Sequence, residues 1–140
     1  MFGNKTIAVA SLTVAALLSA CDSRVSFQRD VNPVLQHNCA TCHSPGGVGF
    51  KMSGFSVQSY AAVMKGTKYG PIVIPGSSQQ SDLVWLLKHG AHPSIDMPKT
   101  CEQFEQESGK CAIASPFAKR LPDKQVAMIS KWVDQGAQNN

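Results

Sequence analysis

The sequence predicts a small all-α domain of about four short helices. Its 140 residues are enough for one domain. Apolar residues recur at helical spacing in several segments bounded by serine, proline and glycine, and we find no segment with the apolar–polar alternation of a strand. Together these features favour one compact helical unit over a sheet or a multidomain enzyme.

The first twenty residues predict an export signal rather than part of this fold. One charged residue, Lys5, precedes an apolar run over 7–18. That run is shorter than the ~20 residues that a membrane-spanning helix needs. It ends in Leu18-Ser19-Ala20-Cys21, which resembles the lipobox of bacterial lipoproteins, where the cysteine receives a lipid and cleavage occurs just before it. The alternative is an ordinary cleavable signal with an incidental Cys21.

The lipobox implies a domain organisation and a location. We expect a lipoprotein signal peptide at 1–20, a lipidated tether at 21–26 and the folded domain at 27–140. Two or more acyl chains at Cys21 would hold the domain firmly, on the periplasmic side of a bacterial membrane. Asp22 resembles an inner-membrane retention signal of enteric bacteria and favours the inner membrane over the outer one.

The first half of the folded domain predicts two helices. Phe27, Val31, Val34 and Leu35 share one helical face, and Pro33 is expected to interrupt this helix and lead into a bend. Residues 44–49 are expected to form a loop because they are rich in glycine. A second helix is expected from Ser56 as N-cap to Lys65, with Gly66 as its terminator.

The second half predicts an extended segment and two more helices. Residues 69–76 are bounded by proline and read as extended. Ser81 is expected to cap a helix that Gly90 stops. The last helix is expected over 122–135, with Pro122 at its first position and Gly136 after its end.

The most specific motif is Cys39-Ala40-Thr41-Cys42-His43. The pattern C-x-x-C-H is the attachment signature of a c-type haem. Two thiols three positions apart on one helical turn can add to the two vinyl groups of one porphyrin, and the following His43 then supplies the proximal iron ligand. A thioredoxin motif would follow a β-strand, and a Cys₄ zinc site would need a second C-x-x-C. The sequence offers neither, so it predicts one covalently bound haem c.

A second axial ligand is sought among four methionines and the remaining histidines. Met97 is the best candidate because it lies in a loop and Pro98 excludes helix beside it. Met52 lies close behind the haem motif, whereas Met64 and Met128 are expected in the core. His89 and His92 are the rivals, either of which would give bis-histidine ligation, although both are expected near a surface. His37 is expected to be solvated.

Cys101 and Cys111 remain as an even pair in an exported chain, which predicts a disulfide. The alternatives are two reduced thiols or a weak metal site. A bridge here would pin the small insertion between the two cysteines.

The chain resembles class I c-type cytochromes, and among them the planctomycete-type cytochrome c domain. The resemblance covers nearly the whole mature chain and is carried by these motifs: Phe27-x-x-Asp30-Val31-x-Pro33-x-Leu35, Cys39-x-x-Cys42-His43, Gly70-Pro71-x-Val73-x-Pro75-Gly76, Ser81-x-Leu83, Met97-Pro98, Leu121-x-Asp123 and Ile129-x-x-Trp132-x-x-x-Gly136-Ala137. It implies covalent haem c, axial ligation by His43 and Met97, and packing of the first helix against the last. The chain departs from the family in the Cys-flanked insertion over 99–120 and in standing alone on a lipid anchor.

These features together predict a mono-haem c-type cytochrome that carries one electron at a time, not an enzyme. Its partners are expected to be redox proteins that bind briefly, since small redox interfaces are weak. The alternatives are a haem-bearing subunit of a larger dehydrogenase or oxidase, and a gas-binding sensor with an open sixth site. The formal net charge of +4 comes from scattered residues, which gives no case for nucleic acid as a partner.

Overall fold

The computed structural model describes residues 24–92, 95–99 and 120–140. Within these ranges the chain forms short helices joined by loops, and its only extended pairing is an isolated bridge between Thr67 and Gly70. The all-α prediction is therefore confirmed for the described residues. The signal peptide at 1–20, Cys21 and the pair Cys101 and Cys111 lie outside them.

Five α-helices and two shorter helical turns make up the described fold. In chain order they are η1 (Phe27–Val31), α1 (Asn32–Cys39), α2 (Val48–Ser53), α3 (Tyr60–Lys65), η2 (Ser78–Gln80), α4 (Asp82–Leu87) and α6 (Asp123–Asp134). In the described part of the chain, none of these is long and apolar enough to cross a membrane.

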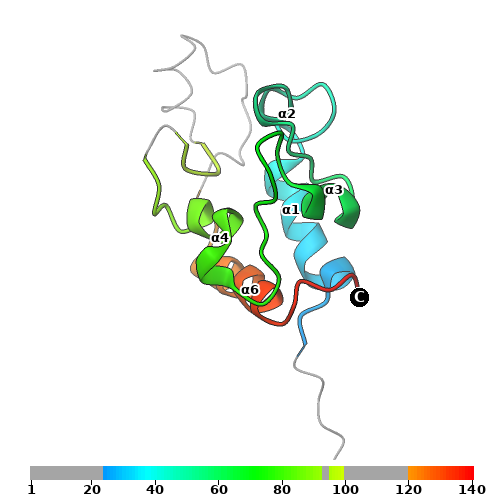
Figure 1. Cartoon of the computed structure of the whole chain (residues 1–140), viewed down its shortest axis with the longest axis vertical. Helices are drawn as coiled ribbons and strands as arrows, with labels where there is room; N and C mark the ends of the chain where they lie inside the picture. Colours follow the sequence, from blue (N-terminus) through cyan, green and yellow to red (C-terminus); the bar gives the residue numbers. More distant parts are fainter. Residues whose placement is uncertain (1–23, 93–94, 100–119) are drawn as a thin grey trace, which may run out of the picture.

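Helix α1 runs along the long axis of the molecule, between its two ends (Figure 1). The described chain starts at one end, beside residue 140, and α1 leads from there toward α2 at the opposite end. Helix α6 lies near the starting end, and α4 lies beside it. The C-terminal end of α1, which carries Cys39, is therefore remote from the start of the described chain.

The core joins the beginning of the domain to its end through aromatic contacts. The ring of Phe27 packs against Trp132 of α6 at a centroid distance of 5.4 Å and edge-on against Tyr60 of α3 at 5.2 Å. Phe27 and Trp132 are both about 1% exposed. Aromatic pairs at these distances stabilise beyond the area that they bury. The expected packing of the first helix against the last is thus present.

Hydrogen bonds close the same junction. The side-chain carbonyl of Asn140 accepts from the amide of Phe27 at 2.9 Å, and its main-chain carbonyl accepts from the amide of Gln28 at 3.1 Å. The hydroxyl of Ser26 also donates to the main-chain carbonyl of Asn140. Because the first four amides of a helical segment lack internal acceptors, residue 140 supplies acceptors that the segment itself does not offer.

Two expectations about the first half of the domain are wrong. Pro33 does not interrupt a helix; it lies in the first turn of α1, where its missing amide hydrogen costs nothing, and α1 continues to Cys39. Residues 44–49 are not loop throughout, because α2 begins at Val48. Gly54 ends α2 in the left-handed conformation, at φ 76°.

Helix boundaries differ from expectation at three further places. Helix α3 begins at Tyr60, since the hydroxyl of Ser59, not that of Ser56, accepts from the amide of Ala62. Helix α4 ends before Gly90, and His89 takes the left-handed conformation instead, at φ 54°. Pro122 is the N-cap of α6 rather than its first helical residue. Gly66 and Gly136 follow their helices as expected.

Candidate haem site

The C-x-x-C-H motif begins on the last residue of α1 and continues its turn. The amides of Cys42 and His43 both donate to the carbonyl of Cys39, at 3.2 and 2.8 Å. These bonds bring the two cysteines onto one side of the turn with His43 directly after them. The thiols of Cys39 and Cys42 are half-buried and not bonded to each other.

Burial keeps both thiols protonated. Burial, together with the smaller effect of the neighbouring Cys42, raises the pKa of the Cys39 thiol to about 12. Burial also raises the pKa of Cys42. At neutral pH both side chains are therefore S–H groups, unlike the low-pKa thiolates of redox-active C-x-x-C sites. This state suits the addition of an S–H bond across a carbon–carbon double bond.

His43 is fixed by the extended segment over 55–57. Its Nδ1 lies 3.3 Å from the carbonyl oxygen of Phe55, and its main-chain carbonyl accepts from the amide of Val57 at 3.0 Å. The Phe55 ring also packs edge-on against the imidazole at 5.2 Å. Nδ1 donating to a carbonyl leaves the lone pair on Nε2, which is the tautomer that ligates a metal.

The electrostatic surroundings keep the His43 imidazole neutral. Burial lowers the pKa of His43, although the Phe55 carbonyl acts in the opposite direction. A neutral ring is needed because a protonated Nε2 has no lone pair to donate. The described contacts of His43 therefore favour the ligating form.

Two further residues hold this arrangement, and the sequence patterns did not single them out. The side chain of Gln36 donates to the carbonyl of Val57 and ties the 55–57 segment to α1. A Cβ at Gly49 would lie 2.7 Å from Cε1 and 2.9 Å from Nε2 of His43, closer than atoms pack. Only glycine lets the backbone of α2 approach the imidazole this closely.

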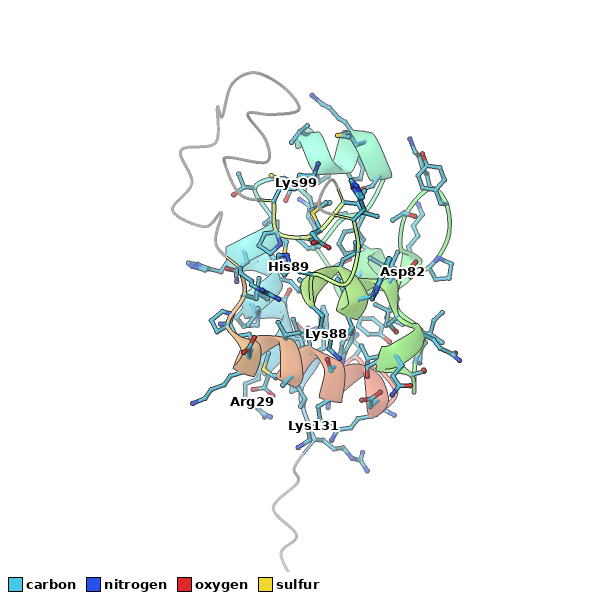
Figure 2. The ribbon with its side chains drawn as sticks, turned by 90° about the vertical axis from the view of Figure 1, so that its left-hand side faces the viewer. Arg29, Asp82, Lys88, His89, Lys99 and Lys131 are labelled. Carbon is cyan, nitrogen blue, oxygen red and sulfur yellow. The ribbon has the colours of Figure 1, made fainter. Side chains whose placement is uncertain are left out.

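Met97 lies on a separate loop that is tied to the end of α4. Its amide donates to the carbonyl of Leu86 at 3.4 Å, and the preceding Asp96 accepts from the amide of Ala91 at 3.1 Å. In both views, this loop lies between α4 and α2 along the long axis (Figures 1 and 2). The Met97 side chain is half-buried.

The other methionines have surroundings that suit other roles. Met64 and Met128 pack against the hydrophobic core as expected. Met52 of α2 is 63% exposed. Among these residues, Met97 alone combines a loop position with partial burial.

One of the three remaining histidines differs from expectation in its exposure. His37 and His92 are exposed, as expected for groups near a surface. His89 is not: its side chain is only 18% exposed, and its Nε2 is buried without a hydrogen-bond partner in the described part of the chain. Its Nδ1 lies 3.5 Å from Oδ2 of Asp96. Figure 2 shows His89 below the Met97 loop.

Residues 39–100 match the family model of the planctomycete cytochrome C. Over these residues the chain is similar to planctomycete-type cytochrome c domains. The match includes the C-x-x-C-H motif and Met97, while η1 and α6 lie outside it. Comparisons with curated proteins and with solved structures found no match.

A cytochrome c domain implies haem c and haem-based electron transfer. The described residues fit that group, since they offer two protonated thiols on one turn and a neutral imidazole whose Nε2 is left unpaired by the Phe55 contact. Two surface hollows of the described residues lie elsewhere, one along α6 and one beside η1 and α3. The residues that fit a haem lie at the junction of α1 and α2.

Proposed function

We propose that the protein is a mono-haem c-type cytochrome that acts as a one-electron carrier, not as an enzyme, on the outside of the cytoplasmic membrane. The observation that carries the proposal is the orientation of His43, whose Nδ1 lies 3.3 Å from the Phe55 carbonyl at the end of the C-x-x-C-H turn. The bound haem supplies an iron that alternates between the ferric and ferrous states. The protein's own residues attach it, orient it and set its potential.

Cys39 and Cys42 attach the group through two thioethers. Each thiol sulfur bonds to one carbon of a vinyl group, and its proton goes to the other carbon, so that no electron is gained or lost. The protonated state that burial gives both thiols provides that proton. Covalent attachment suits a domain of this size, which has limited apolar interior with which to retain a cofactor.

His43 and Met97 are proposed as the axial ligands. The Phe55 carbonyl holds the imidazole in the ligating tautomer and increases its basicity. As a ligand, the thioether of Met97 would favour the ferrous state, so the reduction potential should exceed that of a bis-histidine haem. The bonds to Leu86 and within 91–96 limit how far the Met97 loop can move.

The surface near the haem motif supports brief contact with redox partners. Tyr69 is 83% exposed and Met52 63% exposed. Lys68 lies over the Tyr69 ring at 5.1 Å, and its amide donates to Ser53 at the end of α2. Exposed apolar groups beside lysines suit a small interface with an acidic partner, and such interfaces are weak.

The lipid anchor at Cys21 is proposed from the lipobox, and the fold is compatible with it. The described chain begins at the end of the molecule opposite α2 (Figure 1). A tether attached there would leave the C-terminal end of α1, with its cysteines, facing away from the membrane. Substituting Cys21→Ser should release the protein from membranes without altering its haem spectrum.

Visible and near-infrared spectra of the oxidised and reduced protein test the proposal. A carrier with His43 and Met97 as ligands should be low-spin in both states and show the near-infrared charge-transfer band of ferric His/Met haem. Met97→His should keep the haem low-spin, remove this band and lower the potential. A wild-type spectrum that is high-spin and binds carbon monoxide readily would instead favour the gas-binding sensor. Stable co-purification with a dehydrogenase or oxidase would favour the complex subunit.

A further inference from the structure

We propose that His89 is a second, alternative ligand for the haem iron on the Met97 side, available when the thioether is absent. This inference rests on the proposed function, since it needs haem at Cys39 and Cys42. The observation behind it is Nε2 of His89, which is buried and has no hydrogen-bond partner in the described part of the chain.

A buried, unpartnered imidazole nitrogen needs an explanation. Leaving such a group unpaired costs its full desolvation penalty, so proteins rarely keep one without a ligand or a reactive role. A surface histidine would avoid this cost by facing water, as the exposed His92 does. Coordination of a metal by Nε2 would satisfy the lone pair.

The opposite side of the ring is arranged as in histidine–metal sites. Nδ1 of His89 lies 3.5 Å from Oδ2 of Asp96, and Asp96 is itself buried, with its Oδ1 accepting from the amide of Ala91 at 3.1 Å. A carboxylate beside Nδ1 favours the tautomer with hydrogen on that atom, which leaves the lone pair on Nε2.

The backbone at His89 adopts an unfavourable conformation. Its φ of 54° lies in the left-handed region that residues other than glycine rarely adopt. The next residue, Gly90, packs so closely against the Trp85 indole that a Cβ there would lie 2.5 Å from the ring nitrogen. Strained backbone of this kind tends to persist where it positions a functional side chain.

His89 and Met97 belong to the same structural unit. Asp96, which faces the His89 ring, immediately precedes Met97, and the Met97 amide is bonded to Leu86 at the end of α4. These contacts hold both residues near the end of α4, where Figure 2 shows His89. In the exchange one lone-pair donor replaces another: sulfur leaves, Nε2 binds, Nδ1 keeps its hydrogen and the iron keeps its oxidation state.

Substitution of Met97 by leucine tests the inference, because leucine keeps the apolar volume and removes the sulfur. Ferric Met97→Leu holoprotein should lose the near-infrared band yet stay low-spin, with an electron paramagnetic resonance spectrum of two imidazole ligands. Met97→Leu/His89→Asn should become high-spin and bind cyanide readily. Asparagine is chosen because it tolerates positive φ. The matched control, Met97→Leu/His92→Asn, should stay low-spin.

Two results would overturn the inference. One is a high-spin Met97→Leu protein, which would mean that His89 does not reach the iron. The other is a low-spin signal that survives in Met97→Leu/His89→Asn, or a Met97→Leu spectrum of an amine ligand. Should Met97→Leu/His89→Asn fail to accumulate, Met97→Leu/His92→Asn decides between the two histidines, because a low-spin spectrum of two imidazole ligands in that variant points to His89 and its loss points to His92. A wild-type protein without covalent haem would instead contradict the proposed function, so the two failures are distinguishable.

Discussion

Nδ1 of His43 and the carbonyl oxygen of Phe55 lie 3.3 Å apart, and this contact sets the orientation of the imidazole. It joins the turn after α1 to a segment twelve residues later, which Gln36 ties back to α1. The backbone of Gly49 also lies so close to the ring that any side chain at position 49 would collide with it. The Phe55 carbonyl and the backbone of Gly49 therefore confine the imidazole, together with the Phe55 ring that packs edge-on against it.

Gly49→Ala should displace the His43 ring. The added Cβ would lie 2.7 Å from Cε1, and overpacking of this kind costs about 1–3 kcal/mol. We expect less haem per polypeptide and an altered visible spectrum. Gly46→Ala is the control: its Cβ meets nothing within 4 Å, although its φ of 91° adds backbone strain. It should lower stability without changing the spectrum. A Gly49→Ala spectrum identical to wild type would show that the ring is not confined there.

Protonation of Asp30 should make the domain less stable in acid. The amide of Ser26 donates to its carboxylate at 2.8 Å, and this bond, followed by Arg29, lowers the pKa of Asp30. A carboxylate with a lowered folded-state pKa stabilises the fold above its unfolded pKa, ~3.9, and this contribution is lost as the pH falls through the folded value. Urea unfolding midpoints should be measured from about pH 6 to about pH 2. As the pH falls, the midpoint should decrease more steeply for wild type than for Asp30→Asn. Parallel curves would exclude this role.

Asn140 should matter more than its neighbour Asn139. Asn140→Ala removes the acceptor of the buried Phe27 amide and should cost about 1–3 kcal/mol in the free energy of unfolding. The side chain of Asn139 bonds only the exposed amide group of Gln28 in the described contacts, so Asn139→Ala should change stability by less than about 0.5 kcal/mol. Chemical denaturation compares the two. Equal losses would show that the contact with Phe27 contributes little.

Cys101 and Cys111 are predicted to form a disulfide in exported protein, although they lie outside the described residues. Non-reducing peptide mapping should recover the two segments joined. Reduction, or a double Cys→Ser substitution, should lower stability by up to about 2.7 kcal/mol in the chain-entropy model. Ready alkylation of both thiols without reductant would rule the bridge out.

Sequence patterns predicted the elements whose signals are local. Val126, Ile129 and Val133 recur at helical spacing in the sequence, and all three lie buried on α6, because apolar residues at a period near 3.6 form one face of a helix. The C-x-x-C-H spacing likewise requires a single turn, which the bonds to the Cys39 carbonyl form. Pro33 was misread because proline suits the first turn of a helix as well as a break, and only the surrounding structure decides which applies.

Sequence patterns did not predict the contacts between residues that are distant in the sequence. Nothing in the sequence around Phe55 indicates that its carbonyl faces His43, since every residue has a carbonyl. Gly49 was read as a loop residue, whereas its use is the close approach to the imidazole. His89 was expected near a surface, whereas its side chain is only 18% exposed. Its left-handed backbone has no sequence signature, since the next residue, Gly90, was expected to end the helix.

The central claim is that Cys39 and Cys42 hold one haem covalently, and the mass of the tryptic peptide Asp30–Lys51 tests it most directly. Trypsin cleaves after Arg29 and Lys51, so this peptide contains the whole C-x-x-C-H motif and is independent of any lipid at Cys21. Measured under denaturing conditions, it should exceed its polypeptide mass by one haem, and Cys39→Ser/Cys42→Ser should remove the excess. A wild-type peptide with the bare polypeptide mass, from protein purified with its haem, would contradict the account.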